Sequence, residues 1–207
     1  METKKVNDRI KNDIRDVGSP YDARAARRGI DSRQLTNWYV ITGGPCSGKT
    51  TVVNLLKDRG YKTTVEDARH YVDLQRANGK SVEEVERHQR EFQLRVLELQ
   101  IRQEKALMPS DIVFLDRAIP DARAYYLFLG IPEAKLFTEA MKRVSYKKVF
   151  ILDFLPLVND YARREDAAAQ KKIHKLISEV YESLPFAIVH VPILPPEERV
   201  NFILNNL

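Results

Sequence analysis

The sequence predicts an α/β fold in which helices cover both faces of a parallel sheet. Five short apolar runs alternate with longer stretches of helical periodicity, which is the order of successive β-α units. The runs contain few polar residues, as is typical of strands that are buried on both faces. The glycine-rich segment GGPCSGKT, at residues 43–50, joins the first run directly to a helix.

The predicted elements follow one another regularly along the chain. The strands are expected at residues 38–42, 61–65, 112–116, 148–153 and 186–191. The helices are expected at residues 50–57, 66–76, 82–107, 165–183 and 195–207, with further helical material up to residue 144. On the long helix, the 3.6-residue period places one apolar face on Val85, Phe92, Val96, Leu99 and Ala106.

The composition is that of an ordinary globular protein. The chain has 207 residues, of which 43% are hydrophobic and 30% charged, so one folded domain is expected. The single cysteine excludes an internal disulfide, and no Cys/His spacing is typical of a zinc site. We expect a cytoplasmic protein, because no apolar run reaches the length of a membrane span and the start lacks a signal-peptide core.

The first 36 residues differ in charge from the rest of the chain. They hold nine Lys and Arg against six Asp and Glu, and so carry +3 of the net +5. Mixed charge punctuated by Gly and Pro predicts a flexible arm at 1–36 before a domain at 37–207. Contact of the arm with nucleic acid, acidic lipid or a partner subunit is the alternative. The interleaved charge signs make nucleic acid an unfavourable partner.

The segment at 43–50 satisfies the phosphate-loop pattern G-x-x-x-x-G-K-[ST] between a predicted strand and a predicted helix. Its glycines let the backbone wrap around phosphate oxygens, whose charge is met by N–H groups and the helix N-terminus. Lys49 is expected to reach the β- and γ-phosphates, and the Thr50 hydroxyl to bind Mg²⁺. The predicted nucleotide-binding residues of the loop are Gly43, Gly44, Pro45, Cys46, Ser47, Gly48, Lys49, Thr50 and Thr51. Cys46 is interpreted as a small filler in preference to a nucleophile.

Charged residues follow the next two strands of the predicted sheet. Asp116 ends an apolar strand, where an acid often orients Mg²⁺, although it would also cap the next helix. Arg117 is expected to contact a phosphoryl acceptor or to pair with an acid. Glu66 begins the helix after the second strand and is either a general base or a complement to the helix dipole. The sequence leaves open whether Glu66 or Asp116 is the base.

An arginine pair follows the fourth strand. Arg163 and Arg164 lie in the irregular segment DYARRED. Arginine-bearing lids close over triphosphates and neutralise the charge that develops during transfer, so this segment is predicted to be such a lid. The histidines His70, His88, His174 and His190 are scattered, and none is given a functional role.

Several blocks together resemble a known family. They are VEDARHYV, FQLRVLELQIRQEKAL, VFLDRAIPDARAYY and DYARREDAAAQKKIHKLISEVYESL, in addition to the phosphate loop. From about residue 38 to 204 the chain resembles the NadR-like AAA_28 group of P-loop proteins. That group includes the ribosylnicotinamide kinase domain of NadR-type proteins and a branch of TRPL-translocation-defect proteins. The adenylyltransferase half of NadR-type proteins has no counterpart here, and the arm has none in the family.

The resemblance implies a three-layer P-loop fold of the nucleotide- and nucleoside-kinase type, with strand order 2-3-1-4-5. The residues that it places at the acceptor site are Glu66, Arg69, Asp116, Arg117 and Asp121. Gln100 and Glu104 on the long helix would point toward the same cleft, and Arg163 would be the lid arginine.

The hypothesis that accounts for most of these residues is that the protein is a small-molecule kinase. It would use Mg²⁺ and ATP, with GTP not excluded, to phosphorylate a hydroxyl of a nucleoside-like or other small polar acceptor. A nucleotide-gated regulatory protein, with the arm as partner or lipid contact, is the alternative. A nucleic-acid-linked ATPase is less favoured, because the core lacks a basic stripe with interleaved aromatic residues. The acceptor and the oligomeric state are left open.

Overall fold

The computed structural model describes residues 35–77, 81, 89–154 and 167–207. The chain divides into two units, residues 1–33 and 34–207, and the described residues all belong to the second. The predicted arm therefore lies outside the described residues, apart from its last two positions. The second unit confirms the predicted three-layer α/β fold.

Five parallel strands form the central sheet in the order β2-β3-β1-β4-β5, as predicted. The strands are β1 (Trp38–Thr42), β2 (Lys62–Thr63), β3 (Val113–Asp116), β4 (Lys148–Leu152) and β5 (Ile188–Val191). In the register of the sheet, Ile41 of β1 lies beside Asp116 of β3 on one side and Phe150 of β4 on the other. The carboxyl ends of β1 and β3 thus meet where the phosphate loop begins.

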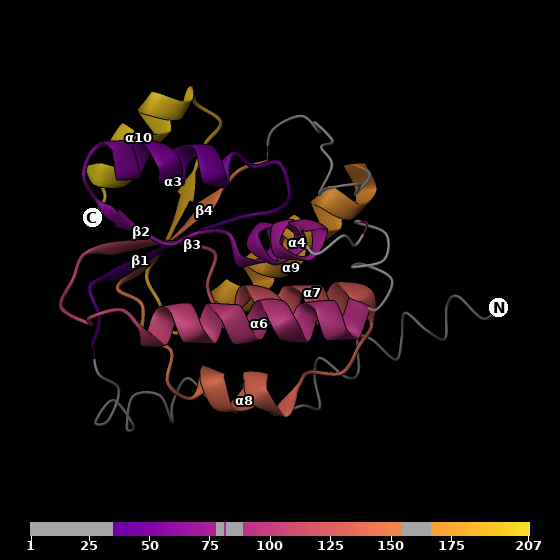
Figure 1. Cartoon of the computed structure of the whole chain (residues 1–207). Helices are drawn as coiled ribbons and strands as arrows, with labels where there is room; N and C mark the ends of the chain where they lie inside the picture. The colour runs from indigo at the N-terminus through magenta and orange to yellow at the C-terminus, as the bar shows by residue number, and fades with distance from the viewer. Residues whose placement is uncertain (1–34, 78–80, 82–88, 155–166) are drawn as a thin grey trace. The chain divides into compact units, whose positions relative to one another are not determined.

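Helices cover both faces of the sheet (Figure 1). They are α3 (Lys49–Asp58), α4 (Asp67–Ala77), α6 (Gln89–Lys105), α7 (Asp121–Leu129), α8 (Lys135–Met141), α9 (Ala167–Glu182) and α10 (Pro196–Leu204). In Figure 1, α3 and α10 lie on one side of the sheet, whereas α6, α7 and α9 lie on the other, with α8 outside them.

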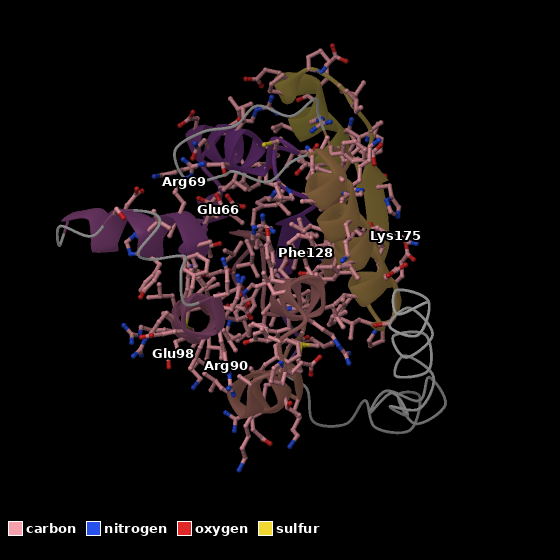
Figure 2. The ribbon with its side chains drawn as sticks, turned by 90° about the vertical axis from the view of Figure 1, so that its right-hand side faces the viewer. Glu66, Arg69, Arg90, Glu98, Phe128 and Lys175 are labelled. Carbon is pink, nitrogen blue, oxygen red and sulfur yellow. The ribbon has the colours of Figure 1, made fainter. Side chains whose placement is uncertain are left out.

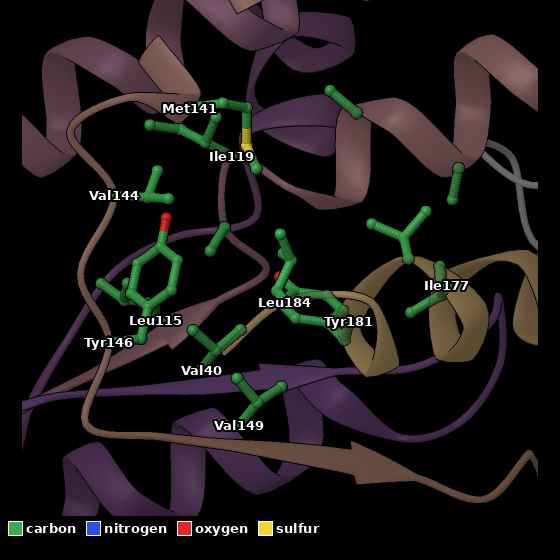
Figure 3. Close-up of a cluster of buried hydrophobic side chains, with 14 of the residues drawn as sticks. Val40, Leu115, Ile119, Met141, Val144, Tyr146, Val149, Ile177, Tyr181 and Leu184 are labelled. Carbon is green, nitrogen blue, oxygen red and sulfur yellow. The ribbon is translucent and has the colours of Figure 1, made fainter. Parts of the chain in front are cut away.

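Alternate residues of β1 belong to two separate cores. Tyr39 and Ile41 pack with apolar side chains of α3 and α10. Trp38 and Val40 pack with side chains of α6, α7, α8 and α9, in the cluster that Figure 3 shows. Because both faces are covered, every position of the strand is buried, which explains the continuous apolar run in the sequence.

The edge strand and the long helix differ from the prediction. The strand predicted at 61–65 is reduced to Lys62–Thr63, since it pairs only with β3 at the edge of the sheet. The apolar face predicted for the long helix is wrong. Its buried residues are Gln93, Leu97, Gln100, Ile101 and Glu104, whereas Ala106 is exposed. The buried face carries polar residues because it packs beside polar groups at the end of the sheet, and Phe92 packs separately on Tyr71 and Val72. Val85 lies outside the described residues.

Phe114 provides a test of the core between the sheet and α3. It is fully buried, stacks on Tyr39 and meets Tyr61 edge-on, with both ring centroids 5.3 Å away. Phe114→Ala should lower the free energy of unfolding by about 3–5 kcal/mol, and Phe114→Leu by roughly 1–2 kcal/mol. Chemical denaturation measures both. Leu127→Ala, at a position 48% exposed, serves as the control with an expected change below about 0.5 kcal/mol. Equal losses at 114 and 127 would contradict this account.

Candidate active site

The phosphate loop leaves β1 and enters α3. At Gly43 the backbone has φ 139°, and an added Cβ would lie 2.6 Å from the carbonyl oxygen of Leu152, so only glycine allows this approach to β4. Gly48, with φ 80°, is the N-cap of α3. The Lys49 ammonium donates to the Gly44 carbonyl at 2.7 Å and to Ser47 Oγ at 3.2 Å. The lysine side chain therefore folds back over the loop.

The two C-terminal helices hold the outer side of this loop. From α9, His174 Nδ1 accepts a hydrogen bond from the Gly44 N–H at 3.2 Å, and the Gln170 amide donates to the Pro45 carbonyl at 2.9 Å. From α10, the buried Arg199 donates to the Ser47 carbonyl at 2.6 Å. Sequence reasoning missed all three residues, because no local motif marks a partner more than 120 positions away.

Oxygen atoms suited to Mg²⁺ gather at the start of α3. The Thr50 hydroxyl lies 3.2 Å from Asp116 Oδ2 and 3.4 Å from Glu66 Oε2. Asp116 is buried, and its Oδ1 has no hydrogen-bond partner among the described residues. Burial raises the pKa of Asp116, and the charge of Glu66 raises it further. The structure thus brings together the two residues predicted to bind the metal.

These oxygens fit a bound Mg²⁺. In the described part of the chain, no group of three or more His, Cys, Asp and Glu side chains is arranged as a metal site. Mg²⁺ in phosphate-binding proteins is usually held by one or two protein oxygens together with phosphate and water. The Thr50 hydroxyl beside Asp116 Oδ2, together with Asp116 Oδ1, which has no hydrogen-bond partner among the described residues, matches that donor set.

A buried arginine lies beside the oxygen cluster. Arg117, with a left-handed φ of 68°, donates from Nε to Glu66 Oε1 at 3.4 Å and from a terminal nitrogen to Asp121 Oδ1 at 3.3 Å. Its guanidinium also lies over the Tyr125 ring, 5.4 Å from the centroid. Arg69 approaches Glu66 from α4, with Nε 3.7 Å from Oε2, and Figure 2 labels both residues. The structure therefore places Glu66, Arg69, Arg117 and Asp121 in one cluster.

Asp121 links this cluster to the core. Its Oδ1 accepts a hydrogen bond from the Thr42 hydroxyl at 2.5 Å, in addition to the one from Arg117. Its Oδ2 accepts from the Ala118 N–H at 3.0 Å and from the Tyr181 hydroxyl at 2.6 Å. Both oxygens of Asp121 are therefore bound by groups of the protein, one of which is the Arg117 guanidinium.

The long helix contributes three polar residues. Glu104 accepts hydrogen bonds from the Ile119 N–H at 3.2 Å and from the Tyr146 hydroxyl at 3.0 Å. The first of these bonds joins the long helix to the turn that follows Arg117. Gln100 is buried on the same face. Gln103 was missed by sequence reasoning. Its amide donates to the Val65 carbonyl at 3.3 Å and to Asp67 Oδ2 at 3.0 Å, and so connects the long helix to the turn before α4.

Three further residues were given roles from the sequence. Arg163 and Arg164, predicted for the lid, lie outside the described residues. Cys46 has φ 57° in the loop and is half-buried. Taken together, the described site can hold phosphate in a backbone loop, a divalent cation at Thr50 and Asp116, and a third group beside Glu66 and Arg117.

Fold and site together define a P-loop protein. The strand order 2-3-1-4-5, a phosphate loop after β1 and an acid at the end of β3 are those of the nucleotide- and nucleoside-kinase type. A family model, AAA_28 (AAA domain), matches residues 38–199, and the chain belongs to this family. A comparison with curated proteins finds no match. In the described part of the chain, no helix is long and apolar enough to cross a membrane.

Solved kinase structures share the fold. NadR protein in complex with NAD and AMP-PNP superposes with a TM-score of 0.58 at 15% identity, over 83% of this chain and 49% of that one. Thymidylate kinase from Ehrlichia chaffeensis gives 0.56 at 16% identity, over 84% and 99% of the two chains. Deoxyadenosine kinase from M. mycoides with bound dATP gives 0.52 at 16% identity, over 82% and 98%. The chain thus spans about half the length of the NadR chain.

Glu104 allows a test by pH. Burial raises the pKa of its carboxyl from 4.5 to about 8 and outweighs the hydrogen bonds from Tyr146 and Ile119, which lower it. Between these values the folded state binds more protons than the unfolded state, so Glu104 lowers stability as pH rises from about 4.5 to 8. Glu104→Gln removes this loss, and the variant should gain up to about 5 kcal/mol relative to wild type between pH 5 and 9.

Denaturant unfolding of both proteins at each pH measures the difference. Glu98→Gln, an exchange at an ion-paired surface position of the same helix, is the matched control. A difference between wild type and Glu104→Gln that does not change with pH would show that Glu104 is already ionised in the folded protein.

Proposed function

We propose that this protein is a Mg²⁺-dependent kinase that transfers the γ-phosphoryl group of ATP to a hydroxyl of a nucleoside-like or other small polar acceptor. The observation that carries the proposal is the contact of Glu66 and Arg117 beside Thr50 and Asp116. A nucleotide-binding loop alone needs neither a buried carboxylate nor a buried guanidinium at this place. The names of the similar structures, which include deoxyadenosine and thymidylate kinases, support the same reaction class.

The loop and the metal-binding residues would hold the donor. Backbone N–H groups of the phosphate loop and the Lys49 ammonium would bind the phosphates. Thr50 and Asp116 would hold Mg²⁺, which neutralises phosphate charge when bound. Phosphoryl transfer needs positioning and charge stabilisation more than covalent chemistry. This requirement accounts for a site built from cations and carboxylates.

Glu66 is the better base of the two candidates. Asp116 lies beside the Thr50 hydroxyl and belongs to the proposed metal site. Glu66 Oε1 faces Arg117, and its Oε2 faces Thr50 and Arg69. A carboxylate that two arginines hold in place beside the phosphate loop is positioned to accept the proton of an acceptor hydroxyl. Arg117 would then stabilise the charge on the transferring group.

A panel experiment tests the reaction. The protein is incubated with Mg·ATP and individual nucleosides and vitamins, and phosphorylated products are scored by mass. We expect a mass gain of one phosphoryl group on one acceptor class, with stoichiometric ADP. Nucleotide binding or hydrolysis with no phosphorylated acceptor would contradict the kinase proposal and favour a nucleotide-gated regulatory protein. Replacing ATP with GTP determines the donor.

Lys49→Ala tests the nucleotide site itself. The variant should lose measurable Mg·ATP binding in calorimetry, because the ammonium that meets the β- and γ-phosphates is gone. Its circular dichroism should show a folded protein at the temperature of the binding assay. Lys57→Ala, at an exposed position of the same helix, is the matched control. Retention of wild-type affinity by Lys49→Ala would refute the assignment of the phosphate loop.

Glu66→Gln separates chemistry from binding. It keeps the size and hydrogen-bonding shape of the side chain but removes the base. The kcat should fall by about 10²–10⁴-fold, while the Kd for Mg·ATP stays within a few-fold of wild type. Steady-state kinetics with the acceptor found in the panel, together with calorimetry, measures the two effects. An unchanged kcat would assign the base role elsewhere.

A further inference from the structure

We infer that His174 is a positioning residue for the phosphate loop, whose neutral imidazole fixes the backbone of Gly44 and makes nucleotide affinity fall on acidification. The inference rests on the proposed nucleotide-binding function. Sequence reasoning assigned His174 no role, and it lies on α9, 130 residues from Gly44.

The first support is the way in which Gly44 is held. Its N–H donates to His174 Nδ1 at 3.2 Å, and its carbonyl accepts from Lys49 at 2.7 Å. A Cβ added at Gly44 would lie 2.8 Å from His174 Cβ and 3.2 Å from the Gln170 carbonyl, so α9 packs directly on this residue. The backbone polar groups of one loop residue are therefore bound by the predicted phosphate lysine and by His174.

The second support is the orientation of the imidazole. Its ring meets the Phe154 ring edge-on, with centroids 5.3 Å apart and planes at 71°. A ring that accepts a hydrogen bond at Nδ1 carries its single proton on Nε2. A second proton would occupy Nδ1 and turn the acceptor into a donor that faces another N–H. Protonation therefore breaks the contact with Gly44.

The electrostatic environment keeps the ring neutral. Burial lowers the pKa of His174 below its usual 6.5, and the charges of Lys49 and His190 lower it further. Asp153, at the end of β4, acts in the opposite direction. These three charged groups, near β4, on α3 and on β5, are the ones that shift the pKa of the ring. At neutral pH the hydrogen bond to Gly44 is intact, and it is lost as pH falls through the lowered pKa.

The sign of the effect separates two roles. If His174 positions the loop, protonation disorders Gly44 and weakens nucleotide binding. If His174 acted as a simple cation near the phosphates, protonation would strengthen binding by Coulomb attraction. The Kd for Mg·ATP between pH 8 and 5.5 distinguishes them, measured by calorimetry without any acceptor.

Two substitutions make the test specific. His174→Ala removes the acceptor and should weaken binding about five- to tenfold at pH 8, the worth of one hydrogen bond. His174→Asn keeps an oxygen acceptor near the position of Nδ1 and does not titrate, so it should bind within about twofold of wild type at pH 8. His70→Asn, at an exposed histidine of α4 whose charge is not among those that shift the pKa of His174, is the matched control.

Because the terminal phosphate of ATP also titrates in this range, each variant is compared with wild type at the same pH. We expect wild type to weaken relative to His174→Asn by about fivefold or more at pH values below the titration midpoint of the His174 ring. The His70→Asn variant should follow wild type. A ratio that stays flat, or one that favours wild type on acidification, overturns the inference while leaving nucleotide binding intact. Absence of Mg·ATP binding by wild type at pH 8 overturns the proposed function instead.

A measurement without nucleotide checks the contact directly. In ¹⁵N-labelled protein, the Gly44 amide resonance should shift with the same pH midpoint as the His174 ring, and this shift should vanish in His174→Asn. A Gly44 resonance that ignores the His174 titration overturns the inference, even if His174→Ala does not fold.

Discussion

The buried carboxylate of Asp121 is the interaction on which the rest of the site depends. It joins β1 through Thr42, the turn after β3 through Ala118, and α9 through Tyr181. A buried charge is tolerated only when it is paired and hydrogen-bonded, and here Arg117 supplies the pairing. The position of the Arg117 guanidinium is therefore set by the core of the protein, and its φ of 68° is maintained by that network.

The phosphate loop depends in the same way on the C-terminal part of the chain. Gly43 lies against the backbone of β4, and side chains of α9 and α10 bind carbonyl and N–H groups of the loop. A loop of glycines has high conformational entropy, so a single bound shape needs such external contacts. The shape of the phosphate loop therefore depends on the packing of α9 against the sheet.

Short sequence patterns predicted those parts of the structure that depend on residues close together in the chain. The apolar runs gave the strands, and the loop motif with the acid after β3 gave the Thr50–Asp116 pair; the strand order came from the family resemblance. Long-range polar contacts were inaccessible: His174 and Gly44 are 130 residues apart, and Arg199 and Ser47 are 152 apart. The face of α6 was mispredicted because Gln93, Gln100 and Glu104 are buried, which a hydrophobic period counts as exposed.

The balance of charge at the site explains why, in the proposed function, the nucleotide would bind as its Mg²⁺ complex. Glu66, Asp67 and Asp116 are all buried near one another; burial raises the pKa of Asp67 to about 7, and the charges of the other two add to the shift. Arg117 and Lys49 both offset part of this acidity, although the Lys49 ammonium also donates to the loop. A triphosphate alone would add negative charge beside three acids. A divalent cation between them reverses that repulsion, so the carboxylates that disfavour free nucleotide favour its Mg²⁺ complex.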